Sequence, residues 1–182
     1  MNLMKDMKSN MTLRGNVEMT EGAGYQLHNI FEYANVLDIG KGWKIDGYRV
    51  WIQDYRLDTQ SNDLATASVE TFLSTDININ GTMQGNCQDN RQIAWGNYTL
   101  GHGAGDKVAT TRVQGCRDEF IWLDPDHLIQ DQLNLWTRFG ASSVIEGQTR
   151  RLNYIVYMRQ YEVTPTESII QNIKSKAQDL SL

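Results

Sequence analysis

The chain is built largely from short segments in which apolar and polar residues alternate, each bounded by Gly, Asn, Asp or Ser. Alternation with a period of two predicts β-strands that bury one face. The predicted strands span residues 11–19, 25–36, 43–57, 65–75, 92–100, 107–113, 119–123, 127–139 and 152–161. Strands at this even spacing, without helical patterns between them, are typical of an antiparallel sandwich or barrel.

The segment 43–57 is long enough to need a bend, and Gly47 is the residue that permits one. Beyond this glycine the side chains alternate strictly between two faces. One face consists of Tyr48, Val50 and Ile52, and the other consists of Arg49, Trp51 and Gln53.

The period changes after residue 161, where we predict a terminal helix over 164–180. Thr164 can cap it, Pro165 suits the first helical position, and Glu167 lies three residues after Thr164, as a capping box requires. An apolar stripe recurs at helical spacing and consists of Ile169, Ile170, Ile173, Ala177 and Leu180. A helix of about fifteen residues is marginal alone. We therefore expect the stripe to pack on the sheet or on a neighbouring subunit.

Size and charge limit the architecture and the partners. A chain of 182 residues with 40% hydrophobic content suits a single domain over 1–182. Its net charge of −5 argues against a surface that binds phosphate everywhere, so nucleic acid must be contacted locally. The candidate contacts are Arg150, Arg151, Lys174 and Lys176, which are equally candidates for ion pairs with Glu162 and Asp179.

Cysteine usage and hydropathy exclude several classes of protein. Cys87 and Cys116 are too few for a disulfide scaffold and are not paired closely enough for a zinc knuckle; we predict free thiols, with a single bridge left open. The first residues contain no apolar stretch long enough for a secretion signal. No segment approaches eighteen uncharged apolar residues, so we expect no membrane partner.

Histidine spacing argues against a metal enzyme. His28, His102 and His127 do not form a His-x-His or His-Glu-x-x-His arrangement, which would place two ligands on one face. The glycine-rich loop around His102 is followed by a strand-like run, so it lacks the context of a phosphate-binding loop. We predict no cofactor and no catalytic residue.

Acidic residues gather at Asp118, Glu119, Asp124 and Asp126. Such carboxylates can bind calcium or serve glycoside hydrolysis. Their spacing is equally that of a strand-end corner around Pro125, whose carboxylates accept hydrogen bonds from nearby backbone amides. We favour the corner, and leave a divalent ion near Asp124 and Asp126 open.

The remaining features point to surfaces and packing. The polar stretch 76–91 predicts an exposed loop. The five tryptophans, Trp43, Trp51, Trp95, Trp122 and Trp136, all fall in strand-like context, where core or interface positions are expected. We predict a subunit interface formed by Ile169, Ile170, Ile173 and Trp136.

The C-terminal third carries a resemblance. Its residues are Asp124-Pro125-Asp126-His127-Leu128 before a strand, the strand 152–161, and Thr164-Pro165-Thr166-Glu167 with a helix ending Lys176-Ala177-Gln178-Asp179. This order resembles the tail of small single jelly-roll capsid proteins of circular single-stranded DNA viruses. The resemblance implies an eight-stranded antiparallel jelly roll, many copies in a closed shell, and no enzymatic activity. The arginine-rich N-terminal arm common in that group is missing here, where only Lys5, Lys8 and Arg14 are basic. This departure implies that genome packing relies on few contacts or on another protein, and leaves open a minor or genome-free shell component.

These observations predict an all-β, two-sheet antiparallel jelly roll with a C-terminal amphipathic helix. Its predicted function is that of a self-assembling capsid subunit, located in the virion and assembled in the host cell, with copies of itself as partners. The alternative is a carbohydrate-binding β-sandwich in which exposed tryptophans contact sugars. A β-sandwich glycosidase that uses Glu119 and a neighbouring aspartate is a third hypothesis.

Overall fold

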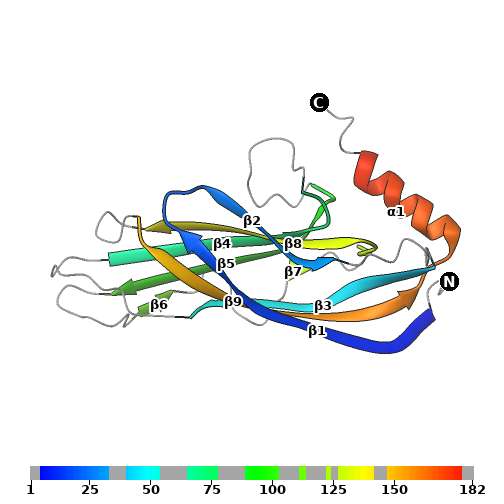
Figure 1. Cartoon of the computed structure of the whole chain (residues 1–182), viewed down its shortest axis with the longest axis horizontal. Helices are drawn as coiled ribbons and strands as arrows, with labels where there is room; N and C mark the ends of the chain where they lie inside the picture. The colour runs from blue at the N-terminus through cyan, green and yellow to red at the C-terminus, as the bar shows by residue number, and fades with distance from the viewer. Residues whose placement is uncertain are drawn as a thin grey trace.

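The computed structural model describes residues 5–32, 40–53, 65–77, 89–102, 111–113, 122–123, 127–141 and 147–177. This part of the chain forms strands followed by a single C-terminal helix (Figure 1). The elements are β1 (Lys5–Thr20), β2 (Tyr25–Glu32), β3 (Lys41–Ile52), β4 (Ala65–Ser74), β5 (Gln92–His102), β6 (Thr111–Val113), β7 (Trp122–Leu123), β8 (Gln132–Ala141), β9 (Thr149–Glu162) and α1 (Pro165–Ala177).

The strand order defines a jelly roll. One sheet has the order β1-β9-β3 and the other the order β2-β8-β4-β5-β6, with β7 also paired to β5; all pairs are antiparallel. The pairs β1–β9, β2–β8 and β4–β5 are nested in the sequence, as in a long hairpin rolled into two facing sheets. Within the described residues, β6 and β7 pair with β5 and not with β3, so the three-stranded sheet ends at β3.

The predicted bend in β3 is confirmed. The register between β3 and β9 shifts between Ile45 and Gly47, which marks a bulge at the glycine. Beyond the bulge Tyr48 and Ile52 are buried, whereas Arg49 is exposed and Trp51 is half-buried. The alternation in this segment therefore assigns its faces correctly.

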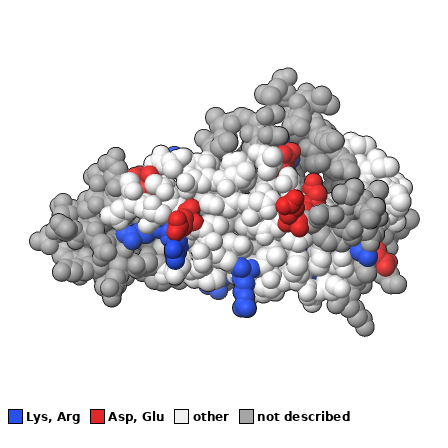
Figure 2. Space-filling view, in the orientation of Figure 1, with Lys and Arg blue, Asp and Glu red and all other residues white. Residues whose placement is uncertain are grey.

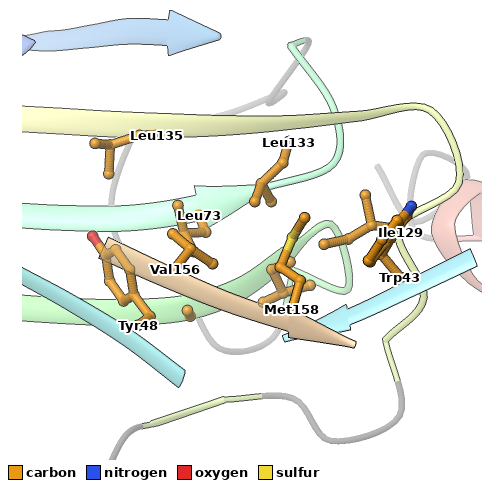
Figure 3. Packing of buried hydrophobic residues seen from close by; sticks show 10 residues of the cluster. Trp43, Tyr48, Leu73, Ile129, Leu133, Leu135, Val156 and Met158 are labelled. Carbon is orange, nitrogen blue, oxygen red and sulfur yellow. The ribbon is translucent and has the colours of Figure 1, made fainter. Parts of the chain in front are cut away.

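The core lies between the two sheets. Leu133 and Leu135 of β8 face Val156 and Met158 of β9, and all four side chains are at most 1% exposed (Figure 3). Trp43 and Ile129 extend this cluster toward one end of the sandwich, beside α1 (Figure 3). Close packing of aliphatic side chains from both sheets is the main force that holds the layers together.

A buried hydrogen-bonded chain also joins the sheets. The hydroxyl of Tyr48, on β3, donates to Oγ1 of Thr71, on β4, at 2.7 Å, and Thr71 donates to the carbonyl of Gly96, on β5, at 3.1 Å. Burial raises the pKa of Tyr48, so its hydroxyl stays protonated and remains a donor. Both buried hydroxyls thus have partners, which a dry core requires.

Two leucines of the six-stranded sheet test this assignment of faces. Leu135→Ala is expected to lower the free energy of unfolding by about 2–5 kcal/mol, because it opens a cavity between the sheets. Leu27→Ala removes the same atoms from a side chain that is 40% exposed, so its cost should stay below about 1 kcal/mol. Equilibrium unfolding in guanidinium chloride measures both, and equal losses would contradict the packing described.

Candidate assembly and binding surfaces

The first turn of α1 is closed by a capping box. The backbone N–H and Oγ1 of Thr164 donate to Oε2 of Glu167 at 2.9 and 2.8 Å, and the N–H of Glu167 donates back to Thr164 Oγ1 at 3.3 Å. The predicted helix start is confirmed at Pro165. The reciprocal bonds satisfy amides that a helix N-terminus leaves without partners.

The base of the helix is fixed to the body of the fold. The side chain of Val163 is 5% exposed, and its N–H donates to the carbonyl of Gly40 at 2.7 Å. Ser168, which is 4% exposed, accepts a hydrogen bond from Nε2 of Gln130 at 2.8 Å. The helix therefore leaves β9 in a direction set by contacts on both sides of its first turn.

The segment that holds the helix is itself part of the core. Trp43 and Ile129 exchange backbone hydrogen bonds of 2.8 and 2.7 Å. Next to them, Leu128 covers Gly42 so closely that a Cβ on this glycine would lie 2.6 Å from the leucine side chain. Gly42 thus permits the close approach on which the helix base depends.

Beyond this base, α1 presents an apolar surface to solvent. Ile169, Ile170 and Ile173 are 59%, 49% and 61% exposed, and we call them the isoleucine ridge. Figure 1 shows the helix projecting from the end of the sandwich beside the C-terminus of β9. Since these three side chains are not covered by the sheets, a neighbouring subunit remains as their predicted contact.

Acidification is expected to loosen the first turn of α1. The hydrogen bonds from Thr164 lower the pKa of Glu167 from its ordinary value of 4.5. Their contribution is present above that value and disappears as the pH falls through the lowered pKa of the folded chain. Amide exchange in residues 166–170, corrected for its intrinsic rate, should therefore increase between about pH 6 and about pH 3.

Glu167→Gln is the matched control for this pH effect. The glutamine cannot ionise, so amide exchange in the variant should not change with pH beyond the intrinsic rate. A parent chain that behaves like the variant across the same range would contradict a role for the carboxylate in the cap.

The outward face of the three-stranded sheet is a second candidate surface, which we call the outer sheet face. Its cationic side chains are Arg14, Lys44, Arg49, Arg151 and Arg159, and its aromatic side chains are Trp51, Tyr157 and Tyr161. The acidic members Glu18 and Asp46 pair with Arg151 at 3.3 Å and Arg159 at 2.9 Å. Figure 2 shows Lys and Arg side chains at intervals along the lower part of the view, where Figure 1 places this sheet.

Trp136, which the sequence groups with the three isoleucines of α1 in a predicted subunit interface, is buried within its own chain. It is 3% exposed, stacks on Phe72 with ring centroids 5.8 Å apart, and donates from Nε1 to Ser74 Oγ at 2.9 Å. Tyr25 and Trp95 pack against this pair on the outward side of the six-stranded sheet. A side chain already covered within its own chain offers almost no area to a second copy.

The four basic residues predicted to contact nucleic acid do not form one patch. Arg150 and Arg151 lie at the start of β9, whereas Lys174 and Lys176 lie in α1, which follows the end of this strand. A strand of this length separates the two pairs by roughly 40 Å. Arg151 is exposed on the outer sheet face, but Arg150 points to the opposite side and donates to Gln148.

The other candidate residues give no chemical centre among the described residues. Nε2 of His28 lies 3.1 Å from Thr137 Oγ1, and burial lowers the pKa of this histidine. Nε2 of His127 lies 3.2 Å from Thr75 Oγ1. Of the predicted positions, Cys87, Cys116, Asp118, Glu119, Asp124 and Asp126 lie outside the described residues, as does the side chain of His102.

Neither a metal cluster nor a membrane span is found in the part of the chain that the structure describes. No group of three or more His, Cys, Asp or Glu side chains converges there. Its helix is too short and too polar to cross a bilayer.

The predicted loop over 76–91 is described only at its ends. The N–H of Thr75 donates to the carbonyl of Arg91 at 3.1 Å, which brings the ends together. Arg91 is 5% exposed, contrary to the expected exposure, because Asp89 accepts hydrogen bonds from its Nε at 2.9 Å and its guanidinium NH2 at 3.0 Å. A charge can be buried when it is paired so fully.

The tryptophans do not meet the premise of the carbohydrate-binding alternative. Trp43 and Trp136 are buried, and Trp51 and Trp95 are half-buried. The side chain of Trp122 lies outside the described part. Sugar recognition by exposed tryptophan rings therefore has no support from these four residues.

Comparisons with known proteins give distant likenesses to viral proteins. VP1 of Trichodysplasia spinulosa-associated polyomavirus matches with a TM-score of 0.45 and 8% identity, covering 90% of this chain and 99% of that chain. The same protein in complex with 3'-sialyllactose gives a TM-score of 0.44. A structure of turnip yellow mosaic virus gives 0.31 at 11% identity, covering 87% and 98%. No family model and no curated protein matches the sequence.

Proposed function

We propose that this chain is a coat subunit that assembles with copies of itself into the closed shell of a virion and has no catalytic role. The proposal is carried by the isoleucine ridge, which combines a fixed base with an uncovered apolar surface. A monomer keeps such a surface in water at a cost, whereas contact with a second copy removes it. The jelly-roll body adds a rigid block from which the ridge projects.

The ridge is large enough to matter energetically. About half of each isoleucine side chain remains exposed. Burial of this remainder contributes on the order of 2–4 kcal/mol per subunit for the three residues together. Closed symmetric assembly repeats the contact around the particle, so a modest pairwise affinity suffices.

The long strand β1 offers a second contact. It pairs with β9 on one side, and no strand of the described residues pairs with its other side over Lys5–Thr20. An open strand edge presents backbone donors and acceptors that another chain can meet. Subunits in a shell therefore have both an apolar and a hydrogen-bonding surface available.

Replacement of two ridge residues by charge tests the proposal. Ile169→Asp combined with Ile173→Asp is expected to raise the protein concentration required for assembly at least about 10-fold, because two apolar side chains leave the interface and two charges are buried in their place. Light scattering and negative-stain electron microscopy of the purified chain measure the particles formed. Circular dichroism verifies that the sandwich is intact.

Ile77→Asp is the matched control, since Ile77 is 47% exposed but lies outside α1. The protein concentration that this variant requires for assembly should remain within about 2-fold of that of the parent, as expected for a surface substitution away from an interface. If the ridge variant assembles like the parent, the ridge is not the interface. If the parent chain stays monomeric at high concentration, the coat-subunit proposal is wrong.

A further inference from the structure

We propose that the outer sheet face binds single-stranded nucleic acid, with its arginines on phosphates and Tyr157 as a stacking platform for a base. This inference deepens the proposed function and rests on it, because it names the partner that a shell of such subunits encloses. The proposed binding site is a single surface of the fold. The basic residues that the sequence suggested as contacts are, by contrast, spread over two places.

Among the described residues, the charge on the outer sheet face is opposite in sign to that of the whole chain. The chain carries a net charge of −5, yet the cationic members of the outer sheet face outnumber the two carboxylates described on it. Those carboxylates are already engaged by Arg151 and Arg159. This majority of cationic side chains over carboxylates among the described residues, on an otherwise acidic protein, favours a polyanion at this place.

Tyr157 lies at the centre of the positive charge. Its ring is 48% exposed, and its partner across the β3 register is Gly47, which has no side chain to cover it. Arg14 and Arg49 both pair with Ile155, two residues before Tyr157, and so lie on the diagonals of the ring. Diagonal neighbours on one sheet face are about 7–8 Å apart, within reach of long side chains.

This arrangement fits a flexible single strand better than a duplex. Arg14 and Arg49 stand on strands either side of β9, roughly 10 Å apart, and both lie diagonal to the tyrosine. Phosphates on both sides of a base can then be contacted while the base stacks on the ring. In a duplex the base faces are already stacked on one another, which leaves Tyr157 without a partner.

The aromatic content separates this surface from a site for acidic protein or lipid. Trp51 lies on the same face one strand away, and Tyr161 lies further along β9 with Nζ of Lys44 5.6 Å from its ring centroid. Arginines interleaved with aromatic rings on an open sheet supply the two kinds of interaction that unpaired nucleotides need. A surface with cationic side chains alone would bind any polyanion without preference for nucleotides.

Binding of fluorescent oligonucleotides tests the inference. The probes are a dT20 strand, an rU20 strand and a 20-base-pair DNA duplex, followed by fluorescence anisotropy over a range of salt concentrations. Tyr157→Leu is expected to weaken binding of the single strands by about 5- to 100-fold, and Tyr157→Phe should bind like the parent. Arg14→Ala with Arg49→Ala should weaken binding and reduce the salt slope by about 0.7 for each phosphate that is no longer neutralised.

Arg138→Ala is the matched control, because Arg138 is an exposed arginine on the other sheet, 3.7 Å from Glu70. It should leave the affinity within about 2-fold of the parent. The dT20 and rU20 strands reveal whether DNA or RNA is preferred. Equal affinity of Tyr157→Leu and parent, or tighter binding of the duplex than of both single strands, would overturn the inference.

Light scattering of the same samples distinguishes the two proposals. Particles that form but do not bind the oligonucleotides would overturn the nucleic-acid inference and leave the coat-subunit proposal standing. A monomer that binds them through Tyr157 would support the inference and contradict assembly. Unfolding midpoints of all variants verify that weaker binding does not come from unfolding.

Discussion

The structure depends on the register of β9, the central strand of the three-stranded sheet. This strand pairs with β1 on one side and β3 on the other, so its alternation assigns both faces at once. Its even-numbered residues Leu152, Val156 and Met158 enter the core, and its odd-numbered residues Arg151 and Tyr157 face outward. A slip of one residue would exchange the two sets, which the cost of burying arginine prevents.

The sequence predicts best what short-range chemistry decides. The capping box at Thr164, the bend at Gly47 and the alternation around it depend on residues a few positions apart, and they are found as expected. The strands themselves follow from their alternation in the same way. These features need no knowledge of which strands become neighbours, whereas the jelly-roll order does and is implied only by the resemblance to capsid proteins.

Long-range pairing decides the surroundings of residues that the sequence alone does not place. Trp136 reads as an interface residue until Phe72, far away in the sequence, is placed beside it. Arg14, Arg49 and Tyr157 share one sheet face only because β1 and β3 both pair with β9. The sequence of each strand shows which of its residues face outward, but only the sheet order shows that the outward-facing residues of β1, β3 and β9 lie on one surface. For the same reason, the net charge of the sequence does not show that cationic residues from distant strands lie together on one face.

The junction between β9 and α1 has a geometric consequence. Only Val163 and Thr164 separate the last residue of the strand from the first residue of the helix, and Val163 is held by Gly40. The helix and the sheets are therefore held at a fixed angle to each other. In a closed particle this angle would set the tilt between neighbouring subunits and hence the radius of curvature of the shell, so particle size would depend on these two residues.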